Sequence, residues 1–152
     1  MSSEQAPRVT IAQFEELLRA TVPLVDVGGV GISASEHPYS VLSLGWGEAV
    51  IRVDYRDHQL RAGGTLSGPT MMTLADTALY AAVLTRIGYE PLAVTSDLNI
   101  RFLRKPAPKP LIGRANILRL GRKLAVGTVE ISSEGEPEGV LVAHATGTYA
   151  IP

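Results

Sequence analysis

Apolar residues recur at helical spacing near the start of the chain, with polar and acidic residues between them. The pattern over residues 9–22 predicts an amphipathic helix that begins at Thr10 as its N-cap and ends near Pro23. Its apolar face would be formed by Ile11, Phe14, Leu17 and Leu18. Residues 1–8 carry no such pattern, and we expect them to be a loose terminus.

A stronger helical pattern covers residues 67–88. Ser67 is a favourable N-cap, Pro69 suits the first turn, and Gly88 suits the C-terminal end. Between them, apolar side chains lie on nearly every side of the predicted helix: Met71, Met72, Leu74, Ala75, Ala78, Leu79, Ala81, Ala82, Val83 and Leu84. A helix that is apolar on nearly all sides is expected to be buried.

Extended apolar runs make up most of the remaining chain. They predict strands over residues 22–33, 40–55, 92–104, 111–120, 123–133 and 140–151. Gly45 and Gly47 predict a bend or bulge inside the second strand, and the polar segment 57–64 predicts a loop. Short turns separate the last four strands, which indicates an antiparallel meander with turns at residues 105–110, 121–122 and 135–139.

This order of elements predicts one α+β domain over residues 1–152. A long antiparallel sheet wrapped around one central helix would satisfy both the strand patterns and the need to bury the helix. The length of 152 residues agrees with a single domain that buries a real core without disulfide or metal support.

Composition excludes several classes of function. The chain has no cysteine and three scattered histidines, so we expect no disulfide, no cysteine nucleophile, no metal and no cofactor. Fourteen basic and fifteen acidic residues give a net charge of −1, which argues against a nucleic-acid partner. We find neither a signal peptide nor an apolar run of the roughly 18–20 residues that a membrane helix needs, so we expect a cytoplasmic protein.

Asp76 is an unexpected residue in the middle of the predicted buried helix. A carboxylate in apolar surroundings is unfavourable unless it is paired or hydrogen-bonded. No neighbour at helical spacing is cationic, although Thr73 and Tyr80 could supply hydrogen bonds. Such a carboxylate suits a general base or nucleophile, with Thr77 and Tyr80 orienting it or a water molecule. The alternative is an acid on an exposed stripe, or one that holds neighbouring backbone.

The start of the same helix offers a second chemical feature. The backbone N–H of Gly68 has no acceptor within the helix, and the helix dipole adds positive charge there. It could bind an anion or polarise a carbonyl oxygen, unless this is an ordinary Gly-Pro helix start. Gly68 lies eight residues before Asp76, about 12 Å along a straight helix. The distance favours a site shared between two subunits, with antiparallel copies of the helix.

Five segments form a recognisable set: Gly64–Pro69, Leu74–Ala78, Thr95–Arg104, Gly121–Arg122 and Ala143–Tyr149. Together they resemble the hotdog-fold thioesterases of the phenylacetate-pathway (PaaI-like) type, over residues 24–151. The resemblance implies an acyl-coenzyme A thioesterase in which Asp76 attacks the thioester carbonyl or activates water, while the Gly68 N–H polarises that carbonyl. It also implies a homodimer or a dimer of dimers with active sites at the subunit interface.

Three positions depart from the family pattern. Ser67 stands at the family histidine, nine residues before Asp76, where we expect it to cap the helix. Pro69 replaces a second glycine, and Arg61 stands where many members carry Asn or Gln. The cation at Arg61 is a candidate for substrate contact.

Charge is distributed unevenly. Residues 98–129 contain eight basic residues and no acid, which indicates an anionic partner, or else a set of solvated outward positions. If the partner is coenzyme A, Arg104, Lys105 and Lys109 around the Pro-rich turn are candidates to contact its phosphates. An acyl pocket could be lined by Trp46, Met71, Met72 and Leu79, although residues of these types more often belong to the core.

Two other functions remain open at this point. A hotdog protein that binds acyl-coenzyme A without hydrolysing it would be compatible with the departures at Ser67 and Arg61. A hydratase or dehydratase would pair the acid with a histidine, for which His58 and His144 are available.

Overall fold

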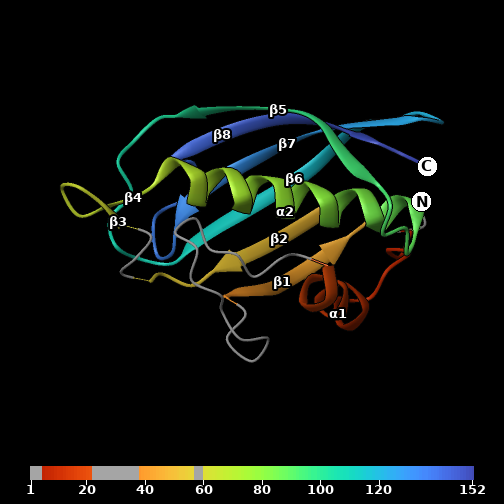
Figure 1. Ribbon diagram of the computed structural model, residues 1–152, viewed down its shortest axis with the longest axis horizontal. Coiled ribbons are helices and arrows are strands. Elements are labelled where there is room, and N and C mark those ends of the chain that lie inside the picture. Colours follow the sequence, from red (N-terminus) through yellow and green to blue (C-terminus); the bar gives the residue numbers. More distant parts are fainter. Residues whose placement is uncertain (1–4, 22–37, 57–59) are drawn as a thin grey trace.

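A long antiparallel sheet curves around one central helix (Figure 1). The computed structural model describes residues 5–21, 38–56 and 60–152. The main sheet has the strand order β1-β2-β6-β7-β8-β5 and is antiparallel throughout. Its strands are β1 (Tyr39–Gly45), β2 (Glu48–Val53), β5 (Val94–Phe102), β6 (Leu111–Leu120), β7 (Leu124–Ser133) and β8 (Ala143–Ala150). The predicted α+β fold is confirmed.

The central helix, α2 (Gly68–Ile87), has the predicted limits. Ser67 is its N-cap, since the Ser67 Oγ accepts a hydrogen bond from the Thr70 N–H at 3.4 Å. Gly88 ends it with a φ of +95°, a conformation that favours glycine. Twelve of its twenty residues are buried, and they face the sheet and α1. The expected burial of this helix is therefore confirmed.

The N-terminal helix, α1 (Ile11–Thr21), lies next to β1 (Figure 1). Thr10 and Gln13 form reciprocal hydrogen bonds, so Thr10 is the predicted N-cap. The preceding segment is not loose at Arg8, because the Arg8 N–H donates to the Thr85 carbonyl at 2.8 Å. The predicted strand over residues 22–33 lies outside the described residues.

Two turn predictions were wrong. The segment 40–55 is two strands joined by a tight turn at Trp46 and Gly47, because its two halves pair with each other. Gly47 has a φ of +77°, which explains the glycine in the turn, and the bulge in β1 lies instead between Val41 and Ser43. The segment 57–64, predicted as a loop, contains the first strand of a small hairpin, β3 (Leu60–Arg61), and the second strand, β4 (Thr65–Leu66), follows directly.

The predicted meander is correct only for β6, β7 and β8. Residues 105–110 do not close a hairpin, because β5 pairs with β8 at the far edge of the sheet, from Val94 opposite Ala150 to Phe102 opposite Ala143. A local turn pattern indicates that the chain leaves a strand, but it does not indicate which strand becomes the neighbour. Among the described residues, β5 has one strand neighbour only, so its other edge is open.

Leu79 of α2 packs onto the sheet where two glycines are paired across strands. Gly127 of β7 lies opposite Gly147 of β8. A Cβ atom on Gly127 would lie 2.6 Å from Leu79 Cδ1 and 2.7 Å from the Asn116 carbonyl oxygen. A Cβ atom on Gly147 would lie 2.7 Å from Leu79 Cδ2. These glycines therefore allow the helix to lie close to the sheet backbone.

In the described part of the chain, no helix is long and apolar enough to cross a membrane.

We expect Gly127→Ala to lower the free energy of unfolding by about 1–3 kcal/mol, because the Asn116 carbonyl belongs to the backbone and cannot move aside. Urea denaturation measures this change. Gly45→Ala is the matched control, since its nearest atom would be the flexible Glu48 carboxylate at 3.4 Å. Equal destabilisation by the two substitutions would contradict the close approach of Leu79 to the sheet.

Candidate active site

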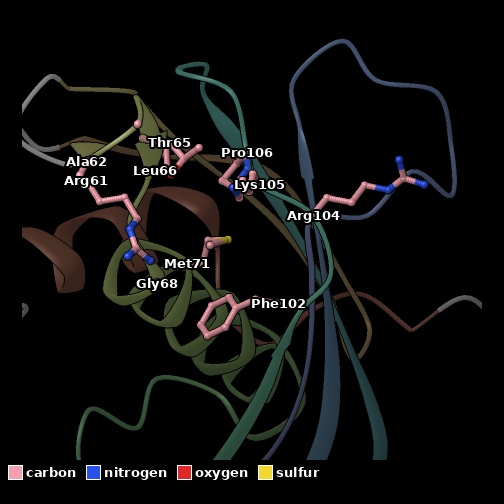
Figure 2. Close-up of a pocket in the computed structure, with 11 residues that line it drawn as sticks. Arg61, Ala62, Thr65, Leu66, Gly68, Met71, Phe102, Arg104, Lys105 and Pro106 are labelled. Atoms are coloured by element: carbon pink, nitrogen blue, oxygen red, sulfur yellow. The ribbon is translucent and has the colours of Figure 1, made fainter.

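The start of α2 combines a pocket with a backbone N–H that has no acceptor within the helix. The Ser67 hydroxyl lies 2.9 Å from the Thr70 hydroxyl and also caps the helix, so it is used locally. The N–H of Gly68, at the first helical position, has no acceptor within the helix. A cavity of about 390 Å³ opens beside it (Figure 2). Loop, helix and strand residues that are far apart in the sequence meet there.

The pocket is cationic and partly apolar. Of the predicted site residues, it brings together Gly68, Arg61, Arg104 and Lys105. Figure 2 shows the Arg61 side chain reaching toward the start of α2 and the Arg104 side chain directed away from it. The apolar lining includes Leu66, Met71, Phe102 and Pro106. None of the described residues that line the pocket is acidic, so it suits an anionic ligand with an apolar part.

Phe102 lies directly against the first residue of the helix. A Cβ atom on Gly68 would lie 3.2 Å from Phe102 Cζ, tighter than an ordinary contact. The Phe102 ring, half of it exposed, therefore forms a wall of the pocket directly beside the Gly68 backbone. No local pattern in the sequence singles out Phe102, because its proximity to Gly68 depends on how β5 returns past the start of α2.

Asp76 projects from the middle of α2 toward the last strand and the edge strand. Its Oδ1 accepts two hydrogen bonds of 2.6 Å, one from the Thr95 hydroxyl on β5 and one from the Tyr149 hydroxyl on β8. Tyr149 also lies 3.1 Å from the Asp76 carbonyl oxygen. Asp76 is half-buried, so these donors offset the cost of removing the carboxylate from water. Sequence analysis did not identify either partner.

The expected hydrogen bonds from Thr73 and Tyr80 to Asp76 are absent from the described structure. The Thr73 hydroxyl donates to the Pro69 carbonyl at 3.0 Å, and the Tyr80 hydroxyl donates to the Pro91 carbonyl at 3.2 Å. Thr77 likewise donates to the Thr73 carbonyl, at 2.8 Å. Helical spacing places these residues beside Asp76, but each hydroxyl is taken by a backbone acceptor.

Two stacked tyrosines lie next to the carboxylate. The ring centroids of Tyr80 and Tyr149 are 5.6 Å apart, with 10° between the ring planes. Burial raises the pKa of Tyr80 to about 12. Burial also raises the pKa of Tyr149, and the negative charge of Asp76 raises it further. Both phenols are therefore neutral near neutral pH, and Tyr149 is available as a donor.

Other predicted residues lie apart from both the pocket and the surroundings of Asp76. Pro69 and Lys109 are exposed and do not line the pocket. Two guanidinium groups lie near the Trp46 ring, with Arg86 4.7 Å and Arg8 5.6 Å from its centroid. Met72 is 41% exposed.

Over the described ranges, no three His, Asp or Glu side chains gather into a possible metal site.

Alkaline pH should destabilise the fold through these tyrosines. An unfolded tyrosine loses its proton near pH 10, whereas folding raises the pKa of Tyr80 to about 12. The folded state then binds more protons than the unfolded state, so the free energy of unfolding falls as the pH rises above about 10. Urea denaturation from about pH 8 to about pH 11 should show a shallower fall in a Tyr80→Phe/Tyr149→Phe double variant. If the free energy of unfolding falls equally steeply with pH in the wild type and in the double variant, the raised pKa of these tyrosines would be contradicted.

Comparison with known proteins agrees with this geometry. The sequence profile named thioesterase superfamily matches residues 63–140. A protein of Silicibacter sp. TM1040, provisionally named a thioesterase, is 36% identical, with a TM-score of 0.80 over 99% of this chain and 96% of that chain. A mutant of the phenylacetic acid degradation protein PaaI from Thermus thermophilus is 33% identical, with a TM-score of 0.66 over 78% of this chain and 96% of that chain.

A provisionally named esterase of Saccharolobus solfataricus is 31% identical over 73% of this chain and 76% of its own length. The profile match includes Asp76 and the pocket residues from Gly63 to Pro106, but not Arg61 and Ala62. The chain therefore belongs to the thioesterase superfamily, as a hotdog-fold protein of the PaaI-like type.

Proposed function

We propose that this protein is an acyl-coenzyme A thioesterase, with Asp76 as nucleophile or general base and the Gly68 N–H as oxyanion donor. Membership of the superfamily supports thioesterase-type activity. The observation that carries the proposal is the fixed carboxylate of Asp76. Within the described part of the chain, both hydrogen bonds to this side chain fall on Oδ1, and Oδ2 takes part in neither. That oxygen is the one available to act on water or on a thioester.

The chemistry needs an acid and an oxyanion donor at one carbonyl group. As a general base, Asp76 takes a proton from water while the water oxygen adds to the thioester carbon. As a nucleophile, Asp76 adds to that carbon itself, and water later hydrolyses the mixed anhydride. In both routes the Gly68 N–H stabilises the oxyanion, the C–S bond then breaks, and coenzyme A leaves as a thiolate that takes up a proton.

A second copy of the chain would bring the two groups together. Within one chain, eight residues of helix separate Gly68 from Asp76, about 12 Å of rise. The exposed or half-buried stripe of α2 contains Pro69, Met72, Thr73, Asp76 and Tyr80, and the open edge of β5 flanks it. Antiparallel pairing of β5 with its copy would continue the sheet and place the two α2 helices antiparallel.

Exposed apolar side chains favour such a homodimer, or a dimer of dimers built from it. Residues on and beside β5 leave about half or more of their surface uncovered: Leu92 72%, Val94 56%, Phe102 50% and Leu103 54%. Such a patch at an open strand edge favours association over a free monomer.

The pocket supports coenzyme A as the leaving group. Arg61 and Lys105 supply positive charge at its wall, Arg104 lines it with its side chain directed away from the start of α2, and the exposed Lys109 lies in the following loop. These cations suit the phosphates of coenzyme A, while Met71 and Phe102 offer apolar contact. The exposed Pro69 follows Gly68 on the outer side of the helix.

A hydratase or dehydratase is less well supported. His144 lies on β8 between the buried Ala143 and Ala145, so it faces away from α2 and from Asp76. His58 lies outside the described residues. Binding of acyl-coenzyme A without turnover is the remaining alternative, and it would need the same pocket without a catalytic Asp76.

Replacing the carboxylate separates these functions. We expect Asp76→Asn to keep the fold and to lower kcat by at least about 10²–10³-fold, because it removes the charge but nearly preserves the shape. Steady-state hydrolysis of short-chain, long-chain and aryl acyl-coenzyme A measures the effect, and circular dichroism checks the fold. Glu136→Gln, an exposed turn acid, is the matched control. Wild-type turnover in Asp76→Asn would favour the binding function.

A shared site predicts complementation between two inactive variants. Gly68→Pro removes the N–H at a position where the extended Ser67, with a ψ of 154°, is compatible with a following proline. Gly68→Ala, which keeps the N–H, controls for the Cβ atom beside Phe102. Refolding Asp76→Asn with Gly68→Pro in equal amounts should restore about a quarter of the wild-type activity, since half of the dimers gain one intact site. Each variant refolded alone is the control. No recovery in proven heterodimers would contradict a site built from two chains.

A further inference from the structure

Two hydroxyl groups from neighbouring strands converge on one oxygen of Asp76. Thr95 and Tyr149 are directly opposite each other in the pairing of β5 with β8. Each donates to Asp76 Oδ1 over 2.6 Å. The register of β5 shifts between Thr95 and Asp97, and this bulge lies at the point where the strand meets the helix residue. Bulges commonly redirect a side chain next to a functional site.

Tyr149 is the more rigid of the two donors. It is 3% exposed, whereas Thr95 is exposed. Its ring stacks on Tyr80, which in turn meets the edge of Phe14 at 5.7 Å and 65°. The Tyr80 hydroxyl is held by the Pro91 carbonyl at 3.2 Å. The Tyr149 ring therefore cannot swing away from Asp76 without disturbing a chain of packed aromatic side chains.

The Tyr149 hydroxyl reaches two acceptors of the same residue. It lies 2.6 Å from Asp76 Oδ1 and 3.1 Å from the Asp76 carbonyl oxygen. One phenolic proton serves both, with the carboxylate as the closer partner. Because one hydroxyl contacts both the carboxylate and the backbone carbonyl of Asp76, it restricts the side-chain torsions of Asp76. Because burial and the Asp76 charge raise the pKa of Tyr149, the phenol keeps this proton near neutral pH.

We infer that Tyr149 is a positioning residue, which fixes the Asp76 carboxylate so that Oδ2 is held toward the reacting group. The inference rests on the proposed role of Asp76 in thioester hydrolysis. Tyr149 does not exchange its proton in this role. It donates to Oδ1 before and after Oδ2 has acted, and Thr95 supplies the second donor.

Tyr149→Phe tests the inference because it removes the hydroxyl and keeps the stacked ring. On the best substrate from the acyl-coenzyme A panel, kcat should fall about ten- to a hundredfold, the range that the loss of one hydrogen bond to a charged group gives. KM should change by less than about twofold, since a positioning hydrogen bond contributes to the transition state more than to substrate binding. Tyr89→Phe, an exposed tyrosine, is the matched control and should keep wild-type kcat.

A double-variant comparison separates positioning from general stability. In an Asp76→Asn background, Tyr149→Phe should change the residual rate by less than about twofold, because its effect passes through the carboxylate. Equal losses in both backgrounds would mean a merely structural role and would overturn the inference. So would a wild-type kcat in Tyr149→Phe while Asp76→Asn is inactive. If Asp76→Asn itself stays active, the proposed function fails first, and the two failures are therefore distinguishable.

Thr95 provides a second variant at an exposed position. Thr95→Val removes the other donor and should lower kcat, whereas Thr95→Ser keeps a hydroxyl and should retain most of it. If Tyr149→Phe does not fold, the comparison of Thr95→Val with Thr95→Ser tests the role of the hydrogen bonds to Asp76. Equal kcat in Thr95→Val and wild type would then overturn the two-donor arrangement.

Discussion

A helix with apolar residues on most of its sides has to be enclosed, and this requirement organises the molecule. Twelve of the twenty residues of α2 are buried. The sheet can cover them closely because Gly113, Gly127 and Gly147 present bare backbone to Leu74 and Leu79. A side chain at the last two glycines would meet Leu79 at 2.6–2.7 Å, so the separation of helix and sheet depends on residues that have no Cβ atom.

The enclosure leaves one stripe of α2 accessible, and that stripe limits where chemistry can occur. Asp76 is on it, half covered, at the place where α2 meets the edge strand β5. Hydroxyl groups of Thr95 and Tyr149 replace the water that burial removes from the carboxylate. The other accessible part of the helix is its start, where Gly68 opens onto a cationic pocket.

Local patterns predicted the helices and strands well, but they did not predict correctly which strands lie side by side in the sheet. The caps at Thr10, Ser67 and Gly88 were predicted because capping depends on residues within one turn of the helix. The hairpin between β5 and β6 was wrong, because a turn pattern carries no information on the partner strand. Four predicted site residues do meet in the pocket, namely Arg61, Gly68, Arg104 and Lys105.

The sequence by itself determined the buried helix, its limits, and the one acid within it, since each follows from residues that are near each other along the chain. Only the tertiary structure decided what surrounds that acid. Thr95 is 19 positions and Tyr149 is 73 positions from Asp76, and both reach it through the register of β5 against β8. A shift of β5 by one residue against β8 would turn the Thr95 hydroxyl to the other face of the sheet, so that it would no longer meet Tyr149 at Asp76. Strand register depends on packing across the whole core, and no local spacing in the sequence encodes it.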